Sequence, residues 1–134
     1  MKRRDLLYKS DISDAKWMAY DIPGNIGWIT YFAVFGKLIR NGMYMDAAKT
    51  AVPAALMATG ICELVSERIN GLDRELPAER LYRGFGALTL GGLTGIAASC
   101  LTGTDRKSKA AMSGGAALCA LFAALIMKEY RRQA

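Results

Sequence analysis

The chain has 134 residues, of which 52% are apolar and 22% charged, with a formal net charge of +6. Its length is typical of a single domain. The sequence contains no histidine, which excludes acid–base catalysis by histidine and metal sites with histidine ligands.

The charges are distributed unevenly along the chain. They cluster at both ends and in short connecting segments, and the stretches between them carry none. Lys and Arg residues that flank apolar segments are typical of membrane proteins. A membrane therefore explains the positive charge better than a nucleic acid does. The sequence predicts an all-α fold over residues 1–134: a small polytopic membrane protein with about four transmembrane helices and an N-terminal interfacial segment.

Residues 1–21 form a polar arm that is basic at its start. Asp11 or Ser13 could cap a short helix that ends at Tyr20. Trp17 and Tyr20 directly precede an apolar segment, as aromatic residues do in the headgroup region of a bilayer. Two interpretations stay open: a helix that lies on the cytoplasmic membrane surface, or a solvated arm.

The first crossing is predicted over residues 22–40. Its opening residues, Ile22-Pro23-Gly24-Asn25, have the composition of a turn and predict a break ahead of the helix proper. The charge-free run ends before Lys37, whose long side chain could reach the outer membrane surface. Asn41-Gly42 predicts the end of this helix.

The second helix is predicted over residues 47–69, beginning near Ala47 or with Thr50 as its N-cap. In the first case Pro53 bends the helix, and in the second it falls harmlessly in the first turn. The uncharged part, from Thr50 to Cys62, is only 13 residues long. Whether this helix crosses the whole bilayer therefore stays open.

The third helix is predicted over residues 77–104, because Asn70-Gly71 should end the second helix and Pro77 suits a first helical position. The run from Gly84 to Thr104 contains 21 residues and no charge. Small residues recur there at every fourth position: Ala87, Gly91, Gly95, Ser99 and Gly103. Such a stripe allows two helix backbones to approach closely in a membrane.

The fourth helix is predicted over residues 110–128, after a charged turn at 104–109. It repeats the four-residue spacing of small side chains at Ala116, Ala120 and Ala124. The short turn makes the third and fourth helices antiparallel neighbours, and their stripes face each other or a second copy of the chain. We therefore expect a homo-oligomer, with the third helix near the interface, or a membrane partner.

The orientation follows from the distribution of Lys and Arg. With four crossings and both termini inside, twelve of these residues lie on the cytoplasmic side and six on the outer side. This asymmetry places both termini in the cytoplasm and predicts a multi-pass protein of the cytoplasmic (inner) membrane.

The candidate functional carboxylates are Glu63 and Glu67, which lie one helical turn apart on one face. In this topology both lie at the inner membrane boundary, and Arg83 at the same depth could neutralise Glu63. A carboxylate at membrane depth indicates a functional site, such as proton or cation binding or a Mg²⁺ site for phosphoryl chemistry. The alternative is a structural ion pair that fixes the helix register.

The remaining polar and sulfur groups predict little chemistry. Asp21, Asp46 and Asp105 are isolated, and we expect topological or capping roles for them. The cysteines are expected to be small buried side chains without disulfides; they are Cys62, Cys100 and Cys119. No resident metal or cofactor and no nucleic-acid partner is predicted.

Three functions fit these observations. The first is a small oligomeric membrane protein that binds or conducts an ion or small solute, with Glu63 as its key carboxylate. The second is a membrane-embedded enzyme that acts on lipid at the cytoplasmic interface, using Glu63 and Glu67, with Asp73 as a further candidate. The third is a structural or regulatory membrane subunit without catalytic activity. A soluble helical interaction module is the alternative if the chain does not enter a membrane.

Overall fold

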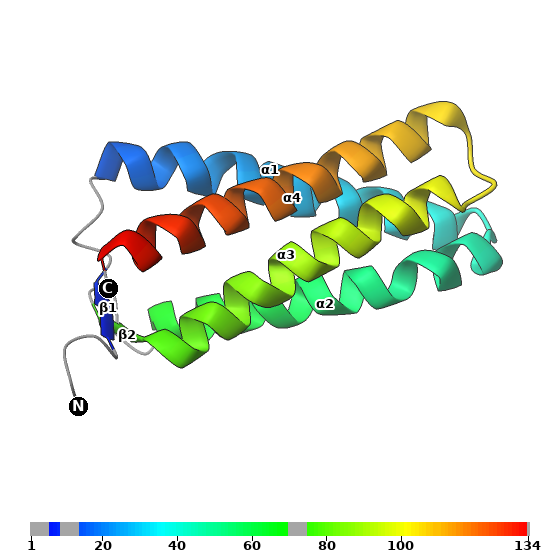
Figure 1. Cartoon of the computed structure of the whole chain (residues 1–134). Coiled ribbons are helices and arrows are strands. Elements are labelled where there is room, and N and C mark those ends of the chain that lie inside the picture. Colours follow the sequence, from blue (N-terminus) through cyan, green and yellow to red (C-terminus); the bar gives the residue numbers. More distant parts are fainter. Residues whose placement is uncertain (1–5, 9–13, 70–74, 134) are drawn as a thin grey trace.

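The fold is an antiparallel bundle of four helices. The computed structural model describes residues 6–8, 14–69 and 75–133, with side-chain positions over most of 22–63 and 83–128. The helices are α1 (Asp14–Arg40), α2 (Tyr44–Ile69), α3 (Ala78–Cys100) and α4 (Arg106–Gln133). They run alternately in opposite directions, with both termini at the same end (Figure 1). The predicted all-α class with four helices is confirmed.

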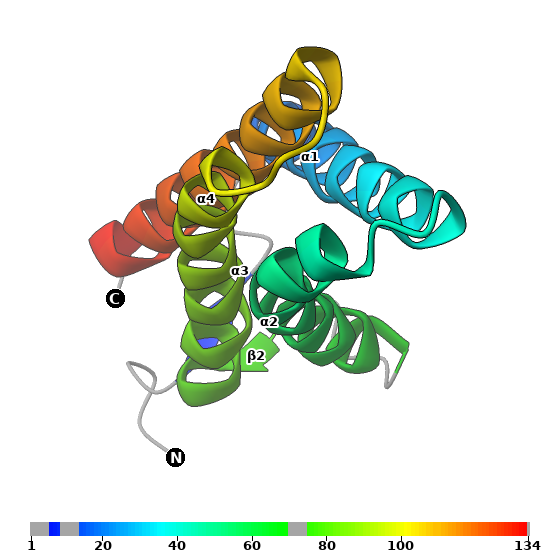
Figure 2. The ribbon, with the colours of Figure 1, turned by 90° about the vertical axis from the view of Figure 1, so that its right-hand side faces the viewer.

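The helices pack in the order α2, α3, α4, α1. The α3 helix lies between α2 and α4, whereas α1 packs chiefly against α4 and contacts α2 far less. Figure 2 views this arrangement from the end at which the connections 41–43 and 101–105 lie. We call this end, residues 37–50 and 99–109, the loop end, and the opposite one the termini end.

Two short strands at the termini end were not predicted. Residues Leu6–Tyr8 form β1 and Glu75–Pro77 form β2, which pair antiparallel with Leu7 opposite Leu76. Three-residue strands are marginal alone, and these two pack against the start of α3 and against α4. Pro77 is therefore the last residue of a strand, and α3 begins one residue later.

The predicted break before the first helix is wrong. The helix begins at Asp14 and continues through Pro23, so residues 14–21 are its first turns and not a separate surface helix. A Cβ atom added to Gly27 would lie 2.5 Å from the carbonyl oxygen of Gly115 on α4. Close packing of this part of α1 against α4 outweighs the turn propensity of the sequence. The rest of the predicted arm, 1–5 and 9–13, lies outside the described residues.

The end of α1 at Asn41-Gly42 is confirmed. Gly42 has a φ of +75°, which glycine adopts without steric cost. The N–H of Gly42 donates to the carbonyl of Ile39 at 3.0 Å, and that of Met43 donates to Leu38 at 2.9 Å. This pair of bonds defines a Schellman motif, which satisfies two carbonyl groups at the helix end.

The second helix begins earlier than predicted, at Tyr44, and Pro53 lies inside it. Thr50 is not the N-cap. Its hydroxyl donates back to the carbonyl oxygens of Asp46 and Ala47, both at 3.1 Å, as a residue within a helix does. The helix is described to Ile69, and the predicted cap pair Asn70-Gly71 lies outside the described residues.

The connection between α3 and α4 also differs from the prediction. The α3 helix ends at Cys100, because the N–H groups of Leu101 and Thr102 turn to carbonyls three residues back. The predicted charged turn is the first turn of α4, which Asp105 caps by accepting the N–H of Ser108 at 3.2 Å. The capping role expected of Asp105 is therefore confirmed.

The centre of the bundle is filled by Tyr31, Met57 and Met112, whose side chains are fully buried. The hydroxyl of Tyr31 donates to the backbone carbonyl of Thr50 at 3.0 Å and so links α1 to α2. A buried phenol needs such a partner, because an unsatisfied hydroxyl in an apolar interior is costly.

One segment among the described residues is long and apolar enough to cross a membrane by length and composition, Arg106–Lys128 in α4. Only 39% of its most apolar window is buried inside the bundle. In the other three helices the charge-free stretches are shorter. By length and composition, α4 is therefore a candidate membrane span, and the described parts of α1, α2 and α3 do not meet the same criterion.

Candidate functional site

The predicted carboxylate Glu63 lies near the end of α2, opposite Arg83 near the start of α3. An oxygen of Glu63 lies 3.6 Å from a guanidinium nitrogen of Arg83, with 28% of the Glu63 side chain and 54% of the Arg83 side chain exposed. The structure thus brings together two of the three residues proposed for this site. Glu67 belongs to α2, but the position of its side chain is not described, and the further candidate Asp73 lies outside the described residues.

The Glu63–Arg83 contact joins two neighbouring helices at the termini end. Its separation is that of an ion pair, and both groups remain partly accessible. Pairs of this kind contribute little to stability in water, because solvent screens them. The geometry fits the structural ion pair, and it leaves the Glu63 carboxylate within reach of a small cation or solute.

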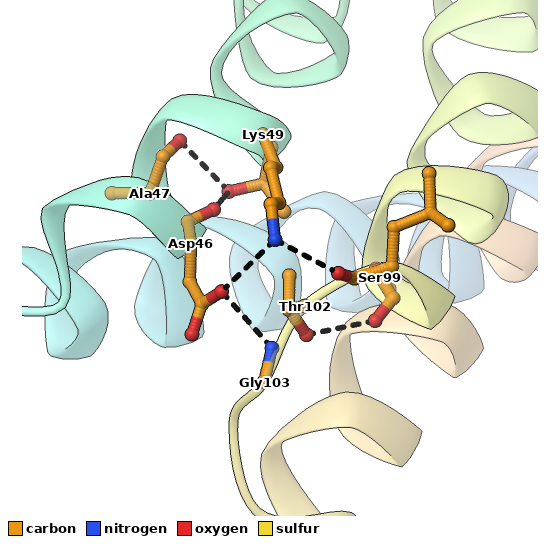
Figure 3. Close-up of polar contacts among 8 residues, drawn as sticks. Asp46, Ala47, Lys49, Ser99, Thr102 and Gly103 are labelled. Atoms are coloured by element: carbon orange, nitrogen blue, oxygen red, sulfur yellow. Dashed lines mark hydrogen bonds and ion pairs between the residues drawn. The ribbon is translucent and has the colours of Figure 1, made fainter.

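A second polar cluster lies at the loop end, around Asp46 (Figure 3). The Asp46 side chain is 12% exposed and accepts the N–H of Gly103 at 3.0 Å. Lys49, one turn later on α2, lies 3.9 Å from the same carboxylate oxygen and donates to the carbonyl of Leu101 at 3.2 Å. Asp46 and Lys49 together fasten the start of α2 to the end of α3.

The electrostatics of this cluster favour both charges. Asp46 lies in the first turn of α2, where the helix dipole is positive, and Lys49 meets a carbonyl just beyond the negative end of α3. Two buried hydroxyls bond locally beside them: that of Ser99 donates to Gly95 at 2.6 Å, and that of Thr102 donates to Ser99 at 2.8 Å. Each of these polar groups therefore has a partner within the protein.

A third contact joins the other two helices at the loop end. The ammonium of Lys37 on α1 donates to the Ser108 hydroxyl at 2.9 Å and lies 3.8 Å from a carboxylate oxygen of Asp105. Hydrogen bonds from Ser108, more than the nearby Lys37, hold the pKa of Asp105 at about 2. We call the Asp46–Lys49 and Lys37–Asp105 contacts the two clamps of the loop end.

Sequence reasoning did not find the clamp around Asp46, which it treated as an isolated acid. The partner of Asp46 is a backbone N–H 57 residues further along the chain, and such a group has no sequence signature. The spacing of Asp46 and Lys49 by three residues was the available signal. A capping role was expected, yet the group that Asp46 binds belongs to the connection after α3.

The predicted packing residues are divided between different neighbours. A Cβ atom added to Gly91 would lie 3.0 Å from the backbone nitrogen of Met57 on α2, and one added to Gly95 would lie 3.1 Å from Ala116 on α4. Ser99 is fully buried and Ala87 half-buried, whereas Gly103 is exposed beyond the helix end.

The close contact between α3 and α4 is made one residue away from the predicted stripe. A Cβ atom on Gly92 would lie 2.5 Å from the carbonyl oxygen of Ala116 and 2.6 Å from the Cβ atom of Ala120. Ala116 and Ala120 are buried, but Ala124 is exposed, and Ala123 takes the inward position. The small residues therefore serve several interfaces within one chain and do not form a single zipper face.

The outward faces of all four helices carry no charge over their central parts. We call this surface the apolar belt. On α1 and α2 its exposed positions are Ile22, Ile26, Ile29, Ala33, Gly36, Ala48, Val52, Ala55, Thr59 and Cys62. On α3 and α4 they are Leu90, Leu93, Ala97, Cys100, Ala110, Gly114, Ala117, Leu121 and Ala124. Apart from Lys49, which directly follows Ala48 on α2, the described charged side chains lie beyond the belt at one end or the other.

The threonines in and beside the belt direct their hydroxyls back into the helices. Thr30, Thr59 and Thr94 each donate to the carbonyl four residues earlier, at 2.7 or 2.8 Å. Two cysteines also face outward: the expectation of burial is right for Cys119 and wrong for Cys62 and Cys100, and all three are free thiols.

No group of three or more His, Cys, Asp or Glu side chains that could hold a metal ion comes together in the described part of the chain. Comparison of the chain with family models, with curated proteins and with solved structures finds no significant match. The function therefore has to be argued from the apolar belt, the Glu63–Arg83 pair and the loop end.

Proposed function

We propose that the chain is an integral membrane protein whose four helices all cross the bilayer. The observation that carries this proposal is the apolar belt, because the outward face of a helix in a water-soluble bundle is normally charged or polar. Exposed isoleucine and leucine side chains on α1, α3 and α4 would instead face lipid. They include Ile26 at 54%, Leu93 at 57% and Leu121 at 54% exposed.

The dimensions of the belt support the proposal. The charge-free stretches of α1 to α4 are 22–36, 50–62, 84–100 and 110–127. At about 1.5 Å per residue they span roughly 20 to 27 Å, against about 30 Å for a typical hydrocarbon core. Lys37, Lys49 and Lys128 at their ends could extend their ammonium groups to the surface and make up the difference.

The local hydrogen bonds support it as well. A hydroxyl in hydrocarbon finds no water, so it must bond to the protein. The threonines in and beside the belt do this: exposed Thr59 and half-buried Thr30 and Thr94 each bond to a carbonyl of their own helix. Both termini lie at one end (Figure 1), as four crossings require. The excess of Lys and Arg at that end favours a cytoplasmic location for it.

Carbonate extraction combined with cysteine labelling tests this topology. In a variant without the three native cysteines, single cysteines would replace Asn41, Lys107 and Lys128, which are all exposed. Retention in the washed membrane, with 41 and 107 labelled from outside and 128 only from inside, is the expected result. Release into the supernatant would overturn the membrane proposal.

Within that class, we propose a structural or regulatory subunit without catalytic activity. The three carboxylates whose side-chain positions are described each lie beside a cation from the protein itself: Asp46, Glu63 and Asp105 pair with Lys49, Arg83 and Lys37. These contacts hold helices and connections in place. The proposal predicts that Glu63→Gln and Asp46→Asn leave cellular function intact, and that the protein copurifies with a membrane partner.

The exposure of Glu63 favours a second candidate, the binding or conduction of an ion or small solute. Its carboxylate stays 28% exposed at the edge of the belt, beside Arg83. Flux measurements in proteoliposomes distinguish the two candidates. Loss of a pH-dependent flux in Glu63→Gln, with activity kept in Glu63→Asp, would establish this role; no flux in the wild type would remove it.

Assembly into a homo-oligomer stays a prediction. Gly91 and Gly95 already pack against α2 and α4 of the same chain. An interface between copies on α3 would therefore use its exposed residues Leu90, Leu93 and Ala97. Cross-linking in mild detergent, with Leu93→Trp as the interface variant, would test it.

A further inference from the structure

The loop end carries more positive charge than its two clamps use. Its six cations and two carboxylates leave an excess of four positive charges. Lys37 and Lys49 serve in the clamps. The side chains of the other four cations make no ion pair or hydrogen bond within the described part of the chain. They are Arg40, Arg106, Lys107 and Lys109.

The position of three of these cations is unfavourable for the fold. Arg106, Lys107 and Lys109 lie in the first turn of α4, which contains no acidic residue. The N-terminal end of a helix carries a partial positive charge and is stabilised by anions, not cations. Asp105 offsets only part of this repulsion. An external anion at this end would offset the rest.

The depth of the cations identifies that anion. In α4 the charge-free stretch begins at Ala110, directly after Lys109, and in α1 Arg40 follows the stretch by one turn. Tyr44, at the same end, is 68% exposed. Tyrosine and basic residues just beyond an apolar stretch lie at headgroup level in a bilayer. In a chain inserted as proposed, the cations would therefore lie at the level of the lipid phosphates.

We propose that the loop end binds the headgroups of anionic phospholipids through Arg40, Arg106 and Lys107. Guanidinium groups suit this ligand, since they can donate two parallel hydrogen bonds to one phosphate. The inference rests on the proposed membrane insertion, since only that brings the loop end to the headgroups.

The test compares two fluorescent lipid analogues, phosphatidylglycerol and phosphatidylcholine, titrated against the purified full-length protein in neutral detergent. The wild type should prefer phosphatidylglycerol, and added salt should weaken the preference. A basic residue at an anionic surface contributes about fivefold to affinity, so R106Q/K107Q should reduce binding by about 25-fold. R106K/K107R, which keeps both charges, should bind as the wild type does.

A stability measurement separates loss of the ligand from loss of the fold. Because R106Q/K107Q removes two cations from the positive end of α4, its Tm in neutral detergent should be equal to or above that of the wild type. R40Q, on a different helix, provides an independent variant and should lower the affinity for phosphatidylglycerol by about fivefold.

Three outcomes would overturn the inference: equal affinity of the wild type for both lipids, unchanged preference in R106Q/K107Q, or an equal loss of binding in K107Q and in K128Q at the opposite end. Carbonate extraction keeps the two proposals apart. A chain that stays in washed membranes but shows no anionic preference contradicts this inference alone.

Discussion

The middle of the bundle and its loop end are held together by different interactions. In the middle, backbones touch at glycines, and the hydroxyl of Tyr31 reaches the backbone carbonyl of Thr50 at the border with the loop end. At the loop end, side chains of Lys37, Asp46 and Lys49 bridge helices and connections through hydrogen bonds and ion pairs.

This difference follows from the surroundings that we propose for each region. Within hydrocarbon, apolar surface gains little by leaving lipid, so helices associate through close shape complementarity. At the level of headgroups and water, charges are tolerated and can lock the connections between helices. The middle should therefore respond to changes of volume, and the loop end to changes of charge.

The largest effect is expected from Gly92→Ala in the middle. The new Cβ atom would meet the Ala116 carbonyl oxygen at 2.5 Å and the Ala120 nitrogen at 2.8 Å, so α3 and α4 would have to separate. Such overpacking should destabilise the protein by about 3 kcal/mol or more. Thermal unfolding of the purified protein in detergent measures this loss.

Gly114→Ala is the matched control for Gly92→Ala. It lies on the outward face of α4, where an added Cβ atom has nothing within 4 Å. It should keep or raise the Tm, because alanine favours the helical backbone. Equal Tm changes in the two variants would show that close helix contact does not hold the middle together.

The next effect is expected at the loop end, from Asp46→Ala. This change removes the acceptor of the Gly103 N–H and the nearest anion to Lys49. Because this hydrogen bond to a charged group is only partly buried, its loss should cost about 1 to 2 kcal/mol. Asp46→Asn, which keeps an acceptor oxygen, should lose clearly less. If both variants unfold at the wild-type temperature, this clamp is not what holds the α3–α4 connection.

The sequence was sufficient to predict four helices and the end of α1. Segregated charge and long apolar runs give the helices, and Asn41-Gly42 has the residue types of a helix stop. The start of α1 was missed, because Pro23 and Gly24 signal a turn locally, whereas packing of Gly27 on Gly115 depends on a contact between distant segments. Local propensity cannot anticipate such a contact.

The candidate sites divide in the same way. The nearness of Glu63 and Arg83 could be predicted, because both flank apolar runs at the same end of antiparallel helices. The clamp around Asp46 could not, since its partner is a backbone group. The sequence also did not show which neighbouring helix each small residue contacts. Adjacent positions on α3 face different helices, because Gly91 packs against α2 and Gly92 packs against α4.

A smaller effect is expected at the termini end, from Glu63→Gln. The change removes one side of an ion pair at 3.6 Å whose partner is 54% exposed. Exposed pairs contribute about 0 to 1 kcal/mol, so the Tm should fall less than in Asp46→Ala. A larger fall in Glu63→Gln would show that the pair is desolvated, and that the termini end depends on charge more than the loop end does.

The smallest effect, and the most specific one, concerns acid stability and Asp105. Its pKa is lowered from 3.8 to about 2, chiefly by hydrogen bonds from Ser108. A carboxyl group with a lowered pKa in the folded state stabilises the fold above its unfolded pKa, and this contribution is lost as the pH falls through the folded value.

Asp105→Asn keeps a capping oxygen but does not titrate, so its Tm should lie below that of the wild type at neutral pH. That difference should shrink between pH 3.8 and about 2. A constant Tm difference over this range would show that the cap works without its charge, and that the loop end depends on shape as the middle does.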